Sequence, residues 1–409
     1  MFPWKAFNRI LYRTYYRGRN LPVFSRSGRW TRAFAARTGP PREEGEILVL
    51  SWGRLGDTIL SLSFLTGLER IFPGKRITWA GRRETAFLLQ GRVHEFLPFS
   101  PGEWMTSPAF RERFLRSVWR RWEILAGDLH LFFGGLFYFH ALIEALPAER
   151  KFLYQGYAPP PDLAPWRPFP GGSVLVPPRP KDFSRKGDPE ELHVLRDQAR
   201  YLRALAGEPE GGEARLPREE KPFPPIGEEG DFQGELPAEP FLLVQAGSNS
   251  PRRRYPPERW RALFSAFPSE TFLLLGTAGE GAALGPPLPG NVRDLRGKTS
   301  LEDCARLMRK ARAFVGLDSG LVHLAAHLGT PVLCVAQSSN LGFFVPYPGD
   351  YRGGVMKVLS HPDFRECSGC MMVCSRESLW KNYRKGLPCL RSVPAEGVIQ
   401  GLRELLQEG

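Results

Sequence analysis

Apolar residues in the first half of the chain alternate between short continuous runs and helical spacing. The run EILVLS (46–51) is typical of a buried strand, and the segment TILSLSFLTGLERIF (58–72) repeats apolar residues at the intervals of an amphipathic helix. RITWA (76–80) predicts the next strand. Strand, helix and strand at this spacing form a βαβ unit, which implies a parallel sheet covered by helices. DLHLFFG (128–134) and KFLYQGY (151–157) are interpreted as later strands of the same sheet.

A second alternating series of the same kind occupies the C-terminal half. Its predicted strands are FLLVQAG (241–247), TFLLLG (271–276), NVRDLRG (291–297), AFVGLD (313–318) and PVLCVA (331–336), and its predicted helices lie near Trp260, at 300–311 and at 320–329. Ser300 and Asp303 have the spacing of a capping pair for the helix that follows them. The series predicts a second doubly wound α/β domain.

The segment between the two series changes to proline, glycine and charged residues, which is the composition of a linker. It contains one helical pattern, PEELHVLRDQARYLRALAG (189–207). We therefore predict a basic N-terminal arm at 1–44, an N-terminal Rossmann-like domain at 45–210, a linker at 211–240 and a C-terminal Rossmann-like domain at 241–409, the last with a tail that contains cysteines. A length of 409 residues is consistent with two separate cores.

The positive charge of the chain is concentrated at its N-terminus. The net charge is +13, but residues 1–42 hold ten Lys or Arg and no acid, so the remainder carries only +3. Aromatic rings alternate with these cations, as in FPWKAFNRILYRTYYRGR (2–19). Such an arm suits an anionic membrane surface, or nucleic acid phosphates and bases, or a solvated position on its own protein. Frequent charges exclude a secretory signal peptide.

The longest apolar stretch is LHLFFGGLFYFHALIEAL (129–146), which is at the lower limit of membrane-spanning length. It contains two histidines, a glycine pair and a glutamate, so we interpret it as a strand, a glycine turn and a helix. The predicted location is the cytoplasm, with contact at the inner face of the cell membrane.

Ligands of doubly wound sheets bind beyond the carboxyl ends of the strands, and three strand ends carry candidate chemistry. The first is GRLGD (53–57), where glycines allow close approach to the backbone and Asp57 lies near the start of a helix. Asp57 is a candidate general base for a substrate hydroxyl. The alternative is an acid that stabilises the N-terminus of its own helix through the helix dipole.

The second strand end is QAGSNSPRRRYPPERW (245–260). Small donors at Gly247, Ser248, Asn249 and Ser250 precede three arginines and a proline-initiated helix, a pattern that predicts an anion site, with phosphate as the anion. The alternative is a basic surface loop.

The third strand end is GLDSGLVHLAAHLGTPVLCV (316–335). Asp318 ends a strand, Ser319 and Gly320 begin a helix, and His323 falls in its first turn. Backbone amides at a helix N-terminus favour a diphosphate. A histidine on a helix is often structural, but its place beside a candidate phosphate site favours a role in binding.

These three segments together resemble glycosyltransferase family 9, the heptosyltransferases of lipopolysaccharide core assembly. The similarity of order and spacing runs from about Ile47 to the C-terminus, and its specific part is the D-[ST]-G-x-x-H block that begins at Asp318. The resemblance implies the GT-B fold, with two Rossmann-like domains facing a cleft. It implies that the N-terminal domain (45–210) holds the acceptor and the C-terminal domain (241–409) the nucleotide sugar. It also implies an inverting, metal-independent transfer. In agreement, the chain contains no D-x-D, the usual carboxylate pair for a metal ion that bridges a diphosphate.

The resemblance also implies roles for individual residues. Asp57, after Gly56, would be the base, Arg253 would pair with the leaving diphosphate where the family usually has lysine, and Glu280 is placed like a ribose-binding glutamate. Amides of Ser319, Gly320 and Leu321 would bind the diphosphate, with Asp318 and His323 shaping the pocket. Ser248 and Asn249 complete the predicted donor site. The donor would be a nucleotide sugar of the ADP-heptose type, and the acceptor a lipid-linked or cell-surface saccharide.

Four late cysteines form a separate group at Cys367, Cys370, Cys374 and Cys389. The C-x2-C spacing of the first two fits one tetrahedral zinc ion, whereas reduced or disulfide-linked thiols are the alternative. No cofactor is expected for catalysis. Two further functions remain open, a nucleic-acid binding protein that uses the basic arm and a catalytically inactive relative that binds a nucleotide sugar.

Overall fold

The structure is a computed structural model of the whole chain, and it describes residues 22–51, 53–127, 142–143, 145–154, 174–176, 193–207, 237–248, 250–338, 340–349, 355–363 and 386–408. The chain divides into two compact units. Unit 1 comprises Met1–Lys181 and Leu195–Pro217, and unit 2 comprises Asp182–Val194 and Arg218–Gly409. The predicted domain boundaries at residues 44, 210 and 240 stay a prediction.

Unit 1 contains a six-stranded parallel sheet in the order β3-β2-β1-β4-β5-β6. The strands are β1 (Glu44–Leu50), β2 (Ile77–Arg82), β3 (Glu95–Phe99), β4 (Arg121–Gly127), β5 (Ala148–Tyr154) and β6 (Val174–Val176). The helices are α2 (Pro22–Thr38), α3 (Leu55–Leu60), α4 (Leu62–Ile71), the 3₁₀ helix η1 (Arg83–Leu88), α5 (Pro101–Thr106), α6 (Pro108–Val118) and α8 (Val194–Leu205).

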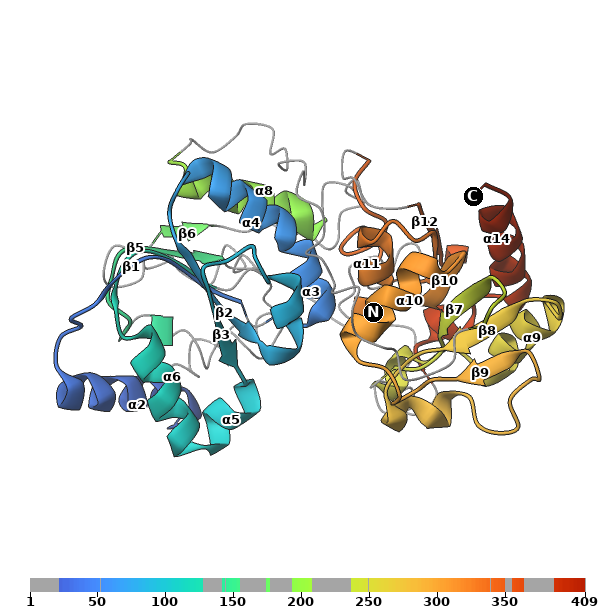
Figure 1. Cartoon of the computed structure of the whole chain (residues 1–409), viewed down its shortest axis with the longest axis horizontal. Coiled ribbons are helices and arrows are strands. Elements are labelled where there is room, and N and C mark those ends of the chain that lie inside the picture. Colours follow the sequence, from blue (N-terminus) through green and yellow to red (C-terminus); the bar gives the residue numbers. More distant parts are fainter. Residues whose placement is uncertain are drawn as a thin grey trace. The chain divides into compact units, whose positions relative to one another are not determined.

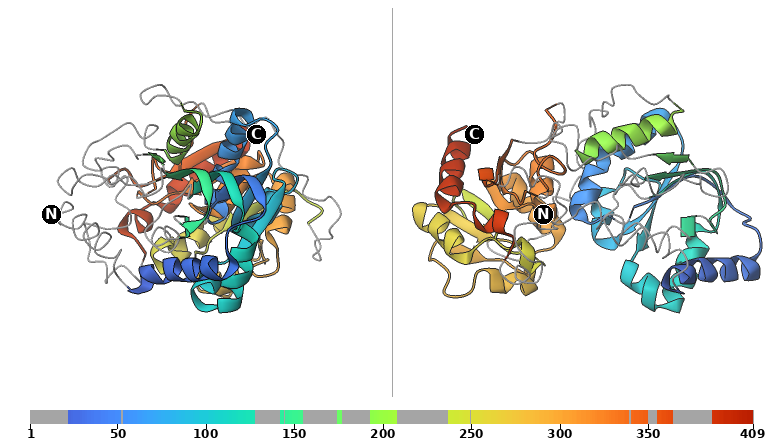
Figure 2. Two further views of the ribbon diagram at one scale, coloured as in Figure 1. Left: turned by 90° about the vertical axis from the view of Figure 1, so that its left-hand side faces the viewer. Right: turned by 180° about the vertical axis from the view of Figure 1, so that it is seen from behind.

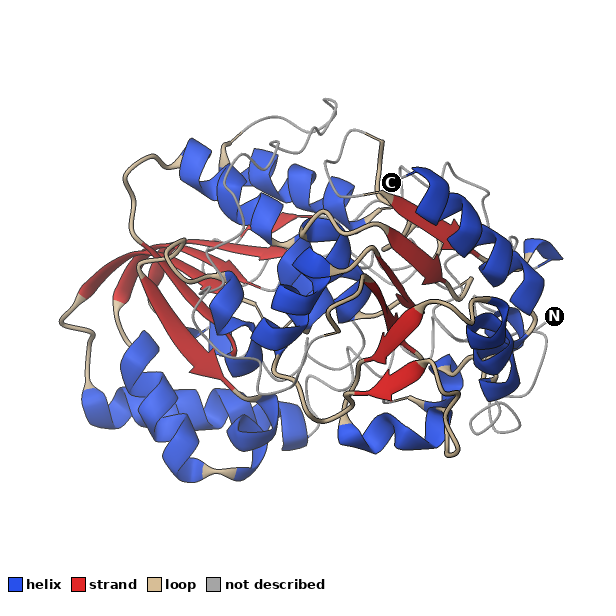
Figure 3. Cartoon of the chain, turned by 45° about the vertical axis from the view of Figure 1, so that its right-hand side comes forward, coloured by secondary structure: helices blue, strands red, loops and turns tan. Residues whose placement is uncertain are grey.

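Helices cover both faces of the unit 1 sheet (Figures 1 and 3). On one face α4 packs against α8, where Gly67 lies so close to Leu202 that an added Cβ would be 2.2 Å from its Cδ1. On the other face, α2, α5 and α6 share a core that contains Phe34, Trp104 and Phe114. The view from behind in Figure 2 shows α8 beside α4. Both faces of the sheet are therefore buried, which explains the continuous apolar run in β1.

Unit 2 repeats this topology with the strand order β12-β11-β10-β7-β8-β9. Its strands are β7 (Phe241–Gln245), β8 (Thr271–Leu274), β9 (Val292–Asp294), β10 (Ala313–Leu317), β11 (Val332–Val335) and β12 (Met356–Leu359). Its helices are η3 (Pro251–Arg253), α9 (Pro257–Ala266), η4 (Ala278–Ala283), α10 (Leu301–Lys310), α11 (Gly320–His327), α13 (Pro388–Arg391) and α14 (Ala395–Glu408). In Figure 1, α9 and α14 lie on one face of this sheet, and α10 and α11 on the other.

Each sheet has a topological switch point, where the chain leaves its first strand in one direction and returns on the opposite side. In unit 1 it lies between β1 and β4, which pair in parallel from Glu44 and Arg121 to Leu50 and Gly127. In unit 2 it lies between β7 and β10, with Gln245 opposite Gly316. The carboxyl ends of these strands are where doubly wound proteins bind ligands. The prediction of two doubly wound domains is confirmed.

Some sequence predictions missed elements or fall outside the described residues. β3 and β4 were not predicted, because their apolar residues are interrupted by charged and proline residues. The predicted strand at 128–134 and most of the apolar stretch 129–146 lie outside the described part of the chain. Among the described residues, no helix is both long and apolar enough to cross a bilayer.

Candidate active site

The switch point of unit 1 presents Asp57 in the first turn of α3. Asp57 Oδ2 accepts a hydrogen bond from the Arg54 N–H at 2.8 Å, so one carboxylate oxygen caps the helix. The other oxygen makes no hydrogen bond within the described residues, and the side chain is half-buried. Gly53 makes this turn possible, because a Cβ there would lie 2.6 Å from the Cβ of Asp57. The structure thus supports the helix-capping interpretation and leaves one oxygen available to a substrate.

A hollow of about 270 Å³ opens at the carboxyl ends of β2 and β3. Its lining residues are Arg82, Arg83, Glu84, Pro98, Phe99, Ser100, Pro101, Glu103 and Phe110. Arg82 pairs loosely with Glu84 at 3.7 Å, and η1, which carries Arg83, packs beside α3. These two arginines were not predicted as site residues, although they follow a predicted strand directly in the sequence GRR (81–83).

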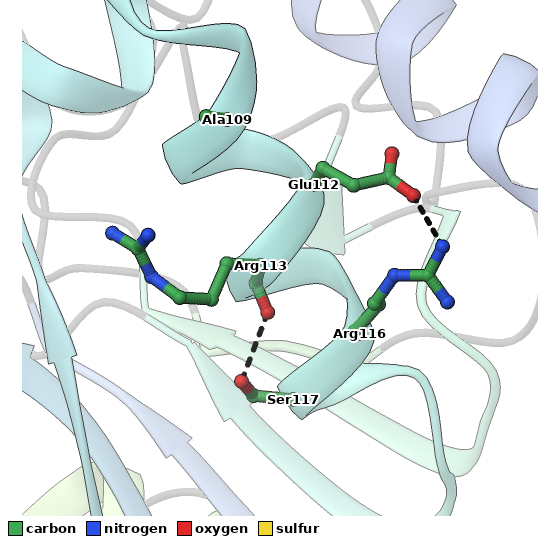
Figure 4. A pocket seen from close by; sticks show the side chains of 5 residues that line it. All are labelled: Ala109, Glu112, Arg113, Arg116 and Ser117. Carbon is green, nitrogen blue, oxygen red and sulfur yellow. Dashed lines mark hydrogen bonds and ion pairs between the residues drawn. The ribbon is translucent and has the colours of Figure 1, made fainter.

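A larger hollow of about 600 Å³ lies over the outer face of α6, away from the strand ends (Figure 4). Within it, Glu112 accepts a hydrogen bond from Arg116 Nη2 at 2.8 Å, and the Ser117 hydroxyl donates to the Arg113 carbonyl. All of its described lining residues come from this one helix, and its side chains are exposed or half-buried. It offers no group suited to sugar transfer.

The switch point of unit 2 gathers the predicted donor residues around the start of α11. The Ser319 hydroxyl donates to Gln245 Oε1, which connects the end of β7 to the cap of α11. The first amides of a helix have no acceptor within the helix, so the N–H groups of Ser319, Gly320 and Leu321 can bind an anion. The anion site at these amides stays a prediction.

Asp318 is buried directly before these amides. Its carboxylate accepts a hydrogen bond from Asn340 Nδ2 and lies 3.5 Å from His323 Nε2. Burial alone would raise the pKa of Asp318. The hydrogen bond and the electrostatic interaction with His323, the hydrogen bond of Asn340 and the positive charge of Arg253 outweigh burial and hold the pKa below its ordinary value. The positive charge of Arg253 therefore acts on the carboxylate that directly precedes the α11 amides.

Arg253 lies in η3, in a loop whose backbone is held by the C-terminal segment. The Leu387 N–H donates to the Arg252 carbonyl at 2.8 Å. Gly386 has φ +82, and a Cβ there would lie 2.7 Å from the Arg254 carbonyl oxygen. The Tyr255 hydroxyl adds a bond to the Val393 carbonyl at 2.9 Å. These contacts fix the backbone from which the Arg253 side chain extends.

Glu280 is buried beside Gly247, with only 4% of its surface exposed. A Cβ on Gly247 or on Gly276 would lie 2.5 Å from Glu280 Oε2, so both glycines make room for this carboxyl group. Oε2 has no hydrogen-bond partner among the described residues. Burial raises the pKa of Glu280, and contacts with Thr277, Gln245 and Arg296 offset only part of this effect. An unpartnered buried acceptor suits a ligand hydroxyl.

We expect the raised pKa of Glu280 to appear as a pH-dependent loss of stability in the ligand-free protein. The native state binds the Glu280 proton more tightly than the unfolded state does, so the free energy of unfolding falls as pH rises from about 4.3 through the raised pKa. Glu280→Gln removes this loss and becomes more stable relative to the natural chain at neutral pH. Urea titrations across this range measure the effect, with exposed Glu258→Gln as the control. Parallel curves for Glu280→Gln and the natural chain would contradict it.

The remaining predicted residues are placed as follows. Ser248 is buried, and its hydroxyl accepts a hydrogen bond from the Ser250 N–H at 3.3 Å. Asn249 lies outside the described residues. Cys367, Cys370 and Cys374 also lie outside them, whereas Cys389 is a buried cysteine in α13. Within the described ranges, no three His, Cys, Asp or Glu side chains gather as metal ligands.

Three polar residues of this cluster were not predicted from the sequence: Gln245, Asn340 and Tyr347. Gln245 was detectable as a polar residue that ends a continuous apolar strand. Asn340 and Tyr347 come from the loop after β11, about twenty residues from the motif they contact, and no local pattern marks them.

Comparison with known proteins finds a family match for part of the chain. A model of glycosyltransferase family 9 (heptosyltransferase) matches residues 215–368. No curated protein matches the chain.

Solved structures with the same fold cover almost the whole chain. The structure of the family 9 glycosyl transferase from Veillonella parvula DSM 2008 has a TM-score of 0.59 at 19% identity, over 89% of this chain and 98% of that one. The structure of ADP-heptose LPS heptosyltransferase II of E. coli has a TM-score of 0.58 at 19% sequence identity, and the match covers 89% of this chain and 99% of that one. The structure of E. coli heptosyltransferase WaaC with ADP has a TM-score of 0.58 at 17% sequence identity, and the match covers 88% of this chain and 99% of that one. At these identities the likeness establishes the fold.

The two Rossmann-like units thus have the GT-B fold of the heptosyltransferase structures, while the basic N-terminal extension stays a prediction. The motif around Asp318 lies inside the segment that the family model matches. The resemblance to glycosyltransferase family 9 is confirmed, and the chain is a glycosyltransferase whose residues 215–368 carry the family 9 (heptosyltransferase) match.

Proposed function

We propose that this chain transfers a heptose-like sugar, with inversion and without a metal ion, from a nucleotide diphosphate sugar to a lipid-linked or cell-surface saccharide. The observation that carries the proposal is the start of α11 in unit 2, where the buried Asp318 directly precedes the first helix amides and the positive charge of Arg253 lowers the pKa of its carboxyl group. E. coli WaaC, which has the same fold, was solved with ADP, in support of a nucleotide diphosphate as the ligand.

The proposed reaction uses each group for one task. The acceptor hydroxyl gives its proton to the Asp57 carboxylate as its oxygen bonds to the anomeric carbon. The bond between that carbon and the phosphate oxygen breaks, and the nucleoside diphosphate leaves with the electron pair. Arg253 and the amides of Ser319, Gly320 and Leu321 stabilise the developing negative charge, which lowers the barrier without a divalent cation. Glu280 receives a hydroxyl of the nucleotide sugar.

The acceptor is proposed to bind at the hollow lined by Arg82 and Arg83. Arg82 and Arg83 stand at the start of η1, which packs against α3, and two such cations suit a saccharide with a carboxylate or phosphate group. Phe99 and Phe110 also line the hollow and offer apolar surface to a sugar ring. This arrangement favours an anionic acceptor over a neutral one.

A thermal-shift screen against nucleotides and nucleotide sugars tests the proposed donor. A ligand that binds only the native state raises the unfolding temperature. We expect nucleoside diphosphates and their sugar conjugates to do so, and free nucleosides to have little effect because they lack the diphosphate. The Arg253→Ala variant is the control. A shift that is equal for nucleosides and diphosphates, or that survives Arg253→Ala, would argue against the anion site.

We further propose that unit 1 contacts an anionic membrane through its N-terminal segment. α2 buries Phe34 in the core of unit 1, and its half-buried Trp30 packs against this core. Its Arg32 and Arg37 are exposed, as are Arg113 and Arg116 of the neighbouring α6. The preceding residues add further cations and rings. Each basic residue near an anionic membrane surface contributes about 1 kcal/mol.

We expect the double substitution Arg32→Glu with Arg113→Glu to weaken binding to phosphatidylglycerol vesicles by at least tenfold, at about 1 kcal/mol for each charge removed. Removal of residues 1–21 should weaken it as well. A longer deletion is unsuitable, because Trp30 and Phe34 belong to the packing of unit 1. Cosedimentation at fixed salt measures the effect, with exposed Arg309→Glu of α10 as the control. Vesicle binding that survives both changes, or tighter binding to an oligonucleotide at the same salt, would oppose the membrane assignment.

A further inference from the structure

His323 is held at both of its ring nitrogens, and one of its partners is Tyr347. Nδ1 lies 2.8 Å from the Tyr347 hydroxyl, and Nε2 lies 3.5 Å from Asp318 Oδ1. The planes of the two rings are tilted by 30° to one another, with centroids 5.8 Å apart. Only 4% of the His323 surface is exposed. The imidazole is therefore positioned by these two contacts and not by solvent.

The ionisation of Asp318 decides where the proton of a neutral His323 lies. A carboxylate with a lowered pKa can only accept hydrogen bonds, and Asp318 also accepts one from Asn340. The nitrogen that faces Asp318 must therefore carry the proton. In a neutral imidazole the other nitrogen, Nδ1, is then an acceptor. The hydroxyl of Tyr347 is the donor placed to satisfy it.

We propose that Tyr347 is a positioning residue, whose hydroxyl donates to Nδ1 and holds neutral His323 in the tautomer that directs the Nε2 proton at Asp318. With His323 and Asn340 both bound to it, the Asp318 carboxylate is kept in place directly before the amides of Ser319 and Gly320. Its negative charge is turned toward these donors, which reduces its repulsion of an anion at the α11 amides.

Tyr347 is itself fixed by the residues that lead into α8. The ring of His193 meets it edge-on, with centroids 5.9 Å apart at 81°. The next residue, Val194, donates its N–H to the Phe343 carbonyl at 3.0 Å. His193 is fully buried. His193 and Val194, which belong to unit 2, thus pack against the loop that carries Tyr347.

Nitrogen NMR of the full chain with ¹⁵N-labelled histidine tests this assignment. The chain has seven histidines, so the His323→Gln spectrum identifies the His323 signals. We expect the natural chain to show a bare nitrogen at Nδ1 and an N–H at Nε2. In Tyr347→Phe the Nδ1 partner is lost, and the signals should move toward those of a mixture of tautomers. Two N–H signals from His323 in the natural chain, or an unchanged spectrum in Tyr347→Phe, would overturn the proposal.

Binding of ADP, measured by calorimetry, provides the second measurement. Loss of one hydrogen bond in the network should weaken ADP binding by roughly two- to tenfold in Tyr347→Phe. Tyr201→Phe is the matched control, because its buried hydroxyl donates to the Phe152 carbonyl at 2.8 Å in unit 1. It should leave both the His323 signals and ADP binding unchanged. Equal loss in both variants would indicate a general effect of losing a buried hydroxyl and would contradict the role of Tyr347.

This inference rests on the proposed function only in the choice of ADP as the ligand. If ADP does not bind the natural chain, the proposed donor site fails, while the nitrogen signals still decide the tautomer. If ADP binds and the signals show doubly protonated His323, the donor site stands and the role of Tyr347 fails.

Discussion

Asp57→Asn is expected to reduce turnover by about 10²- to 10⁴-fold, the usual contribution of a general base, and to leave the affinity for the nucleotide unchanged. The asparagine oxygen can still accept the hydrogen bond of the Arg54 N–H, so the cap of α3 is retained. Affinity is preserved because the proposed nucleotide contacts belong to unit 2. Single-turnover kinetics and calorimetry with ADP measure the two quantities separately.

A control variant and a stability measurement accompany this prediction. Glu112→Gln removes a carboxylate of the same unit from the surface of α6 and should leave turnover unchanged. Thermal unfolding of Asp57→Asn should match that of the natural chain, because the helix cap remains. Turnover within tenfold of the natural chain would show that Asp57 is only a helix cap. If the chain binds nucleotide sugars without transferring the sugar, neither the natural chain nor Asp57→Asn will show turnover.

Arg253→Ala should have the second largest effect, a loss of nucleotide diphosphate affinity by about 10- to 150-fold. This corresponds to the 1.5–3 kcal/mol typical of hydrogen bonds to charged groups. The loss should extend to turnover, because the negative charge on the leaving diphosphate grows as the sugar departs. Arg253→Lys should recover part of the affinity, since lysine supplies the charge but not the planar pair of donors.

Calorimetry with ADP at several salt concentrations checks the role of Arg253. Exposed Arg309 of α10 provides the matched control, and Arg309→Ala should bind ADP as the natural chain does. The affinity of Arg253→Ala should also depend less on salt than that of the natural chain, because one charge contact is missing. Equal affinity of Arg253→Ala and the natural chain would remove this arginine from the site.

Local patterns predicted most of unit 2. The apolar runs that became β7, β8, β10 and β11 are continuous because both faces of the sheet are covered, and such runs can be recognised without a structure. Ser300 caps α10 as its spacing predicts, with Asp303 N–H donating to its hydroxyl at 3.0 Å. Prediction was poorer in unit 1, where β3 contains Pro98 and β4 begins with Arg121 and a tryptophan. Their strand conformation depends on pairing with β2 and β1.

The amino-acid sequence by itself determined the two α/β halves, the strand ends that carry Asp57, Arg253 and Asp318, and the resemblance to family 9. These features depend on residues close together in the chain, so spacing alone reveals them. The tertiary structure alone showed that Gly247 and Gly276 accommodate Glu280, that residues 386–387 hold the backbone of the Arg253 loop, and that Tyr347 contacts His323. Each of these joins segments far apart in sequence, and only packing in the folded chain brings such segments together.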